Sequence, residues 1–231
     1  MKIAMVVFDL AGTTVNDGDA VNRVLRDALA ASGVMVDRDA VNSVMGLPKP
    51  IAIRTMIALA DPQDSIAGHV DAVHEDFVAR MMRFYEDDPV VAEFAGTSST
   101  FRSLRDAGIK IAIDTGFSRD ITAIILKRLG WERAGLVDAS ITSDEVPNGR
   151  PYPDMIHELM RRLEIQDARK VAKIGDTPSD LEEGARAGCG RVIGVWGGSH
   201  SREQLALHPH TDLIATVADL PSLLGLPHRR T

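Results

Sequence analysis

Short apolar runs alternate with helical patterns along most of the chain. Each run is β-branched or apolar and is followed by Gly, Thr, Asp or Ser, which is typical of a strand buried in a parallel sheet. Between the runs, apolar residues recur at helical spacing. The alternation predicts an α/β fold with a doubly wound, Rossmann-like parallel sheet. The expected strands lie within 2–10, 109–116, 135–146, 169–177 and 190–198, and the expected helices at 97–108, 118–130, 152–165 and 179–188.

One long segment interrupts this alternation. Residues 17–90 contain no convincing strand and instead carry four helical patterns, at 19–33, 37–46, 49–60 and 65–87. Such an all-helical insertion between the first strand and the next strand–helix unit predicts a cap over the edge of the sheet. We therefore assign residues 1–16 and 91–231 to the Rossmann-like core and residues 17–90 to a helical cap domain.

Charge and composition exclude several classes of function. The 231 residues carry a net charge of −7, which disfavours binding to nucleic acid or to an anionic membrane surface. The single cysteine excludes an intramolecular disulfide. The apolar N-terminal run is too short for a signal peptide, and no stretch approaches the length of a membrane span. We expect a cytoplasmic protein.

Polar side chains gather where the expected strands end. The first strand ends at Asp9, the second offers Asp114 and Thr115, and the fourth is followed by Asp176 and Asp180. Any one of these aspartates could simply cap the next helix. In a parallel sheet, however, the carboxyl ends of the strands meet at one edge, where ligands bind. Taken together, the residues predict a site there.

The residue types at this edge suit one kind of chemistry. Carboxylates from adjacent strands form the oxygen-rich site that Mg²⁺ prefers. Arg150, in the loop after the third expected strand, could be a surface residue, but beside a metal its guanidinium suits a phosphoryl group. A carboxylate held against such a group can attack phosphorus and form an aspartyl-phosphate. The site is therefore expected to bind a small molecule that carries a phosphoryl group.

Three motifs resemble the haloacid dehalogenase superfamily of phosphotransferases. "DLAGTT" at Asp9, "IAIDTG" ending after Thr115, and "GDTPSD" at Asp176 are similar to its first, second and fourth motifs. The helical insertion resembles the cap of that superfamily. Two positions depart from its common pattern. Ala11 stands where phosphatases carry a general-acid aspartate, and Arg150 stands where most members have lysine. An alanine cannot transfer protons, so ester hydrolysis should lose roughly 10²–10⁴-fold in rate.

Both departures resemble one branch of the superfamily, the phosphonoacetaldehyde hydrolases. That branch has D-x-A-G-T-T at the first motif, G-R-P-x-P at the third and M-G-x-x-K in the cap, and this chain has "DLAGTT", "GRPYP" and "MGLPK". The resemblance implies cleavage of a carbon–phosphorus bond, through an imine on Lys49 and an aspartyl-phosphate on Asp9. Because the leaving group is then carbon, there is no oxygen to protonate, and this explains Ala11.

The resemblance also implies a set of site residues. Mg²⁺ would be held by Asp9, the backbone carbonyl of Ala11 and Asp176, with Asp180 orienting these ligands. The expected substrate contacts are Gly12, Thr13, Met45, Gly46, Thr115, Gly116 and Arg150. Gly46 is also expected to let the cap approach the core closely.

Several alternatives remain open from the sequence. Lysines at helix starts are usually solvated, which is the competing interpretation of Lys49. Ala52 and Phe117 replace a histidine and a tyrosine of the branch, so the substrate could be a related phosphonoaldehyde. The competing functions are a Mg²⁺-dependent phosphatase or phosphomutase of a small phosphate ester, and a catalytically weak phosphate-binding module. The resemblance further implies a homodimer through the cap, with which the helix bearing Met81 and Met82 is compatible.

Overall fold

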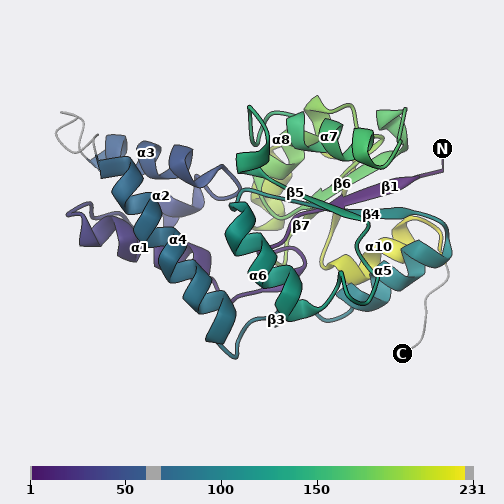
Figure 1. The fold of residues 1–231 in the computed structure, drawn as a ribbon. Helices are drawn as coiled ribbons and strands as arrows, with labels where there is room; N and C mark the ends of the chain where they lie inside the picture. Colours follow the sequence, from purple (N-terminus) through teal and green to yellow (C-terminus); the bar gives the residue numbers. More distant parts are fainter. Residues whose placement is uncertain (1, 61–68, 227–231) are drawn as a thin grey trace.

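A six-stranded parallel sheet forms the centre of the molecule, in the order β5–β4–β1–β6–β7–β8 (Figure 1). The computed structural model describes residues 2–60 and 69–226. The sheet confirms the predicted α/β class. Its strands are β1 (Met5–Phe8), β4 (Lys110–Thr115), β5 (Ala139–Thr142), β6 (Val171–Gly175), β7 (Arg191–Val195) and β8 (Asp212–Ile214).

Helices cover both faces of this sheet. In Figure 1, α7 and α8 lie above it, whereas α5, α6 and α10 lie below it. The sheet is therefore doubly wound, as predicted. The helices outside the insertion are α5 (Thr97–Asp106), α6 (Arg119–Leu129), α7 (Asp154–Arg162), α8 (Pro178–Arg186), α9 (Arg202–Leu205) and α10 (Leu220–Leu223).

Strand β1 shows why the central strands are apolar throughout. It lies between β4 and β6 and is fully buried. Because successive side chains point to opposite faces, Val6 and Phe8 join one hydrophobic cluster, while Met5 and Val7 join another under the opposite layer of helices. Phe8 packs against Phe101 of α5 with ring centroids 4.9 Å apart. Each face of the sheet thus has its own core.

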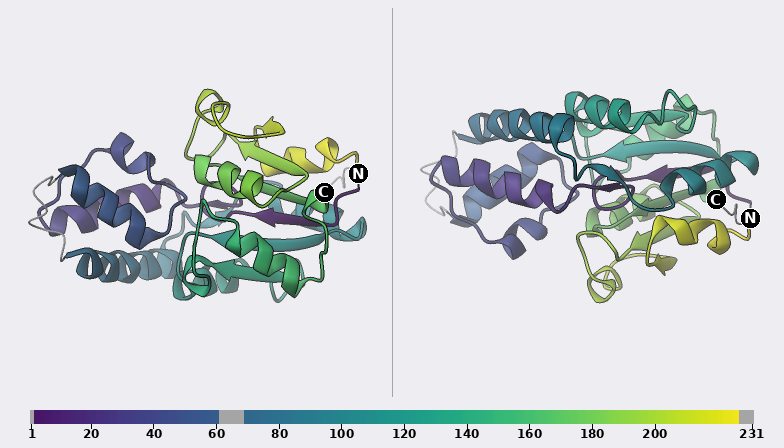
Figure 2. Two further views of the ribbon diagram at one scale, coloured as in Figure 1. Left: turned by 90° about the horizontal axis from the view of Figure 1, so that it is seen from above. Right: turned by 90° about the horizontal axis from the view of Figure 1, so that it is seen from below.

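The insertion is helical and lies beyond the carboxyl ends of the strands (Figure 2). A short antiparallel ribbon of β2 and β3 flanks it. The first four residues of the helix expected at 65–87 lie outside the described residues, and the boundary at residues 17–90 stays a prediction. The elements are β2 (Val15–Asn16), α1 (Ala20–Ala31), α2 (Arg38–Asn42), α3 (Lys49–Ala60), α4 (Val70–Asp87) and β3 (Ala92–Glu93).

Helix α4 joins this insertion to the helices that cover the sheet. It packs against α6. From α6, Arg128 donates hydrogen bonds to the backbone carbonyls of Tyr85 and Glu86, at 2.8 and 2.9 Å, and also to that of Asp88. A guanidinium there satisfies carbonyls that a helix end leaves without partners. Met81 is buried within the molecule and Met82 is half-buried, and the predicted dimer stays a prediction.

Three local predictions differ from the structure. Strand β8 was not predicted, because its three half-buried residues form no apolar run. Helix α2 is shorter than the pattern at 37–46 suggested. Helix α5 ends at Asp106, two residues before the end of the pattern at 97–108. Over 2–60 and 69–226, none of the helices is long and apolar enough to cross a membrane.

Candidate active site

The carboxyl ends of the central strands bring the predicted polar residues together. Asp9 follows β1, Thr115 ends β4 and Asp176 follows β6, and all three are buried. Burial raises the pKa of Asp9 to about 7, with Asp180 and Asp176 also raising it, whereas Arg150 and Lys173 lower it. An acidic centre therefore lies under the insertion.

A small cavity of about 30 Å³ connects this centre to the insertion. The cavity is lined by eight of the residues predicted from the sequence, and also by Val21, Phe117, Thr177 and Ser199. The eight are Asp9, Ala11, Met45, Gly46, Lys49, Thr115, Gly116 and Arg150. Two other predicted substrate contacts lie beside it. Gly12 lines a neighbouring cavity, and the Thr13 hydroxyl donates to Oδ1 of Asp176 at 2.8 Å.

Arg150 is one of the most buried large side chains, at 1% exposure, so the surface-loop interpretation is wrong. Its Nη1 donates to Oδ1 of Asp9 at 2.7 Å, and its Nε donates to Oε2 of Glu183 at 3.0 Å. Its Nη2 donates to the side chain and the backbone carbonyl of Asp114. Such a fixed guanidinium holds the Asp9 carboxylate in one orientation.

Three buried carboxylates form a group that could hold a cation. Oxygen atoms of Asp9, Asp176 and Asp180 lie within 4.8 Å of one another. Burial, together with the charge of Asp180, raises the pKa of Asp176 to about 6. Gly12 and Gly198 leave room around Asp176, since a Cβ on either would lie 2.3 or 2.5 Å from its Oδ2. A hard divalent cation suits this all-oxygen donor set.

Lys49 begins α3 and is buried, at 5% exposure. The solvated interpretation of this residue is therefore wrong. Its Nζ lies 5.5 Å from the ring centroid of Phe117 and 5.9 Å from that of Phe77, which comes from α4. Burial lowers the pKa of Lys49 to about 8, with Asp9 opposing and Arg150 reinforcing the shift. An amine with this pKa is partly neutral near physiological pH, as a nucleophile requires.

The loop before Lys49 touches the core through glycines. At Gly46, whose φ is +83°, a Cβ would lie 2.2 Å from Oγ1 of Thr177. A Cβ at Gly116 would lie 2.9 Å from the carbonyl oxygen of Leu47, and one at Gly149 would lie 2.6 Å from Pro48. The predicted close approach of Gly46 is confirmed. This contact holds the start of α3 over the acidic centre.

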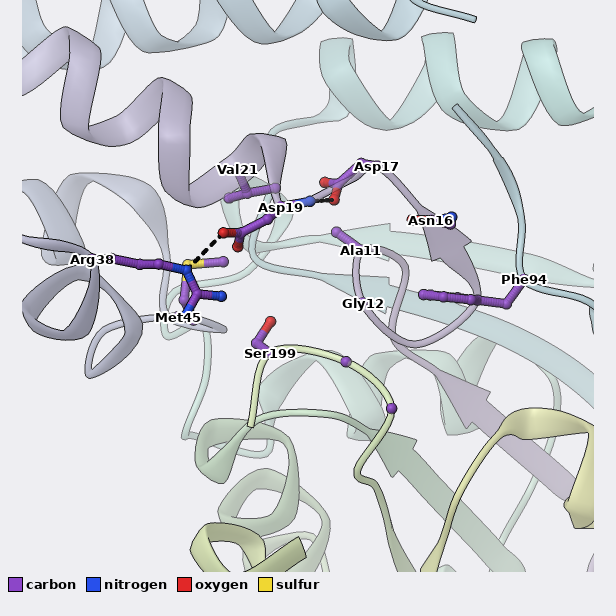
Figure 3. Close-up of a pocket in the computed structure, with 12 residues that line it drawn as sticks. Ala11, Gly12, Asn16, Asp17, Asp19, Val21, Arg38, Met45, Phe94 and Ser199 are labelled. Carbon is purple, nitrogen blue, oxygen red and sulfur yellow. Dashed lines mark hydrogen bonds and ion pairs between the residues drawn. The ribbon is translucent and has the colours of Figure 1, made fainter. Parts of the chain in front are cut away.

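A second cavity of about 180 Å³ lies next to the first (Figure 3). The two share Ala11, Val21, Met45 and Ser199. On its far side, Nε of Arg38 donates to Oδ2 of Asp19 at 2.9 Å, which joins the starts of α1 and α2. Both side chains of this pair are about half exposed. The second cavity is therefore the larger of the two and has half-exposed side chains at its edge.

Sequence reasoning missed Val21 and Ser199 in the lining of the cavity, and also three residues around its charged groups. Lys173 and Glu183 are fully buried beside Arg150, and Phe77 faces Lys49. A lysine inside an otherwise apolar buried strand was a usable signal, because such a charge needs a partner. Glu183 lies three positions after Asp180, on the same helical face. Phe77 gave no signal, because its contact depends on how two helices pack.

Comparisons with known proteins agree with this geometry. The family model for haloacid dehalogenase-like hydrolases matches residues 6–195. Phosphonoacetaldehyde hydrolases from Bacillus cereus and Bacillus anthracis are each 32% identical over 209 residues, covering 86% of this chain and 78% of theirs. The crystal structure of a phosphonoacetaldehyde hydrolase-like protein from Oleispira antarctica superposes with a TM-score of 0.86. It is 22% identical, and the match covers 97% of this chain and 92% of that one.

Proposed function

Because this chain belongs to the haloacid dehalogenase-like hydrolase family, we propose that it cleaves the carbon–phosphorus bond of phosphonoacetaldehyde or a related phosphonoaldehyde. The single observation that carries this proposal is the shared cavity of Lys49, Asp9 and Ala11. A buried amine and a buried carboxylate line the same cavity as residue 11, the position where an ester hydrolase needs a second acid.

The proposed reaction has four steps that balance. The neutral Nζ of Lys49 attacks the aldehyde carbon, and the adduct takes up one proton from solvent and loses water to give a protonated imine. A carboxylate oxygen of Asp9 then bonds to phosphorus as the carbon–phosphorus bond breaks, and that electron pair forms an enamine on Lys49. Protonation at carbon and hydrolysis release acetaldehyde from the parent substrate. Water finally hydrolyses the aspartyl-phosphate to phosphate.

Ala11 fits this sequence of steps. In ester cleavage the leaving oxygen needs a proton from a nearby acid. In the proposed reaction the electron pair passes into the imine instead, so a methyl group at residue 11 costs nothing in that step. Ala11 also leaves the passage between the two cavities uncharged, because it lines both of them.

The carboxylates of Asp9 and Asp176, with the backbone carbonyl of Ala11, would hold Mg²⁺, and Asp180 would orient them. The ion would supply positive charge next to the transferring phosphoryl oxygens. Thr115 and Arg150 would contact the same oxygens from the other strands.

A direct test uses phosphonoacetaldehyde and Mg²⁺ with release of phosphate as the readout. Borohydride added during turnover should inactivate the enzyme and add the reduced two-carbon unit to Lys49, as located by mass spectrometry. Lys49→Ala should abolish both effects, whereas exposed Lys127→Ala should change neither.

The competing functions give different results in the same assay. Release of phosphate only from esters, or full activity in Lys49→Ala, would replace the imine mechanism with that of a phosphatase or phosphomutase. Phosphate release from neither class of substrate, with retained phosphate binding, would indicate the weak binding module. EDTA should stop turnover in either enzymatic case, and added Mg²⁺ should restore it.

A further inference from the structure

Lys173, in the middle of β6, has an ammonium group that is completely buried. Strand β6 pairs with β1, which leads to Asp9, so this charge lies beneath the candidate site. Removing an ammonium group from water costs several kcal/mol unless it is paired, which requires a specific set of partners. Those partners are three carboxylates.

The carboxylates around Lys173 are the ones that Arg150 also contacts. Lys173 Nζ pairs with Asp114, and lies 3.0 Å from Oδ1 of Asp180 and 3.4 Å from Oε2 of Glu183. Arg150 contacts the same three, with Nη1 lying 2.9 Å from Oδ1 of Asp180.

Arg150 has one further ionic partner, which Lys173 lacks among the ion pairs of the described residues. That partner is Asp9, whose Oδ1 lies 2.7 Å from Nη1 of Arg150. Asp9 and Asp180 therefore share one nitrogen of the guanidinium. Without Lys173, Arg150 would have to pair with Asp114, Asp180 and Glu183 without the help of that second cation. These three side chains would then compete with Asp9 for the N–H donors of Arg150.

We propose that Lys173 is a positioning residue, which shares the three inner carboxyl groups with Arg150 and so leaves Nη1 of Arg150 bonded to Asp9. The ionised state of Asp114 supports this role. Although burial raises the pKa of Asp114, the charges of Arg150 and Lys173 hold it below its ordinary value. An anionic Asp114 attracts whichever cation remains, so removal of Lys173 draws the guanidinium away from Asp9.

This inference rests on one part of the proposed function, namely that Asp9 accepts the phosphoryl group. It depends neither on the Lys49 imine nor on the nature of the broken bond. The probe is therefore beryllofluoride with Mg²⁺, which mimics a phosphoryl group on an aspartate and needs no substrate. Its bound form is measured by fluorine NMR on the full-length protein.

Lys173→Met should weaken beryllofluoride binding at least about 30-fold, because breaking a buried pair is costly. Lys173→Met combined with Asp114→Asn removes one charge of each sign and should recover at least about tenfold of that loss. A merely structural role for the lysine would not be rescued in this way. Exposed Lys170→Met is the matched control and should bind as the parent does.

Three results would overturn the proposal. Lys173→Met could bind within about threefold of the parent, or the double variant could bind no better than Lys173→Met. Where Lys173→Met fails to fold, the double variant is compared with Asp114→Asn instead. A double variant that is unfolded, or that binds beryllofluoride over tenfold more weakly than Asp114→Asn, contradicts the proposal. A parent protein that does not bind beryllofluoride at all would instead remove the role of Asp9, and with it both proposals.

Discussion

Nη1 of Arg150 lies 2.7 Å from Oδ1 of Asp9, although the two residues are 141 positions apart in the sequence. The contact joins the loop after β5 to the end of β1. It fixes one oxygen of Asp9 and leaves the other as the available nucleophile. The carboxylate is therefore oriented before any substrate binds, which reduces the entropy cost of the reaction.

Replacement of Asp9 by Asn should abolish phosphate release from phosphonoacetaldehyde, with a loss in kcat of at least about 10⁴-fold. An amide keeps the shape of the side chain but is a poor nucleophile toward phosphorus. Steady-state phosphate assays measure the effect, and circular dichroism monitors the fold. Asp27→Asn on the exposed side of α1 is the control. Substantial residual turnover in Asp9→Asn would exclude an aspartyl-phosphate.

Activity should depend on pH through Lys49. Burial lowers the pKa of this amine to about 8, and only its neutral form attacks an aldehyde. The rate of borohydride trapping at Lys49 should therefore rise about tenfold per pH unit below pH 8 and level off above it. A quenched-flow series from pH 6 to 10 measures this rate, with mass spectrometry as the readout. A profile still rising at pH 10 would indicate an ordinary solvated lysine.

Introducing an acid at residue 11 should change the type of bond that is cleaved. Ala11→Asp supplies the group that protonates a leaving oxygen, so hydrolysis of an alkyl ester such as ethyl phosphate should rise by roughly 10²-fold or more. Phosphonoacetaldehyde cleavage should fall, because a new charge enters the passage between the two cavities. Ala11→Asn, of matched size but without the acid, should lower phosphonate cleavage without raising ester hydrolysis. Equal ester rates for the two variants would argue against this role.

Gly46→Ala should disturb the contact between the insertion and the core. The new Cβ would lie 2.2 Å from Oγ1 of Thr177, and the residue already has a positive φ. Gly33 has the same φ of +83°, but a Cβ added there would meet nothing within 4 Å. Gly33→Ala therefore measures the backbone strain without the steric clash. Strain alone should cost about 1–2 kcal/mol of the free energy of unfolding in both variants.

The test of this prediction is the difference between the losses measured for the two glycine variants. Gly46→Ala should lose about 1 kcal/mol more than Gly33→Ala, and it should also lose at least about tenfold in kcat, because the start of α3 moves. Urea unfolding and phosphate release measure the two effects. Similar losses in both variants would show that the close approach has no part in activity.

The meeting of Asp9, Thr115 and Asp176 could be predicted from the sequence, because parallel strands place their carboxyl ends at one edge. The position of Lys49 over that edge could be predicted only through the family motif. The sharing of carboxylates between Arg150 and Lys173 could not, since it depends on which rotamers the packed helix α8 permits. The same holds for Phe77, which reaches Lys49 from another helix.

The small size of the cavity around Lys49 has a consequence for the speed of the enzyme. With a volume of about 30 Å³, against about 180 Å³ for the cavity beside it, this cavity is the narrow end of the site. A phosphonoaldehyde that comes in through the wider cavity therefore gains room beside Lys49 when residues 46–48 separate from Gly116 and Gly149. If that separation limits turnover, kcat follows its rate rather than the rate of bond cleavage. Solvent viscosity, which slows such movements but not bond cleavage, becomes a variable that this enzyme should sense.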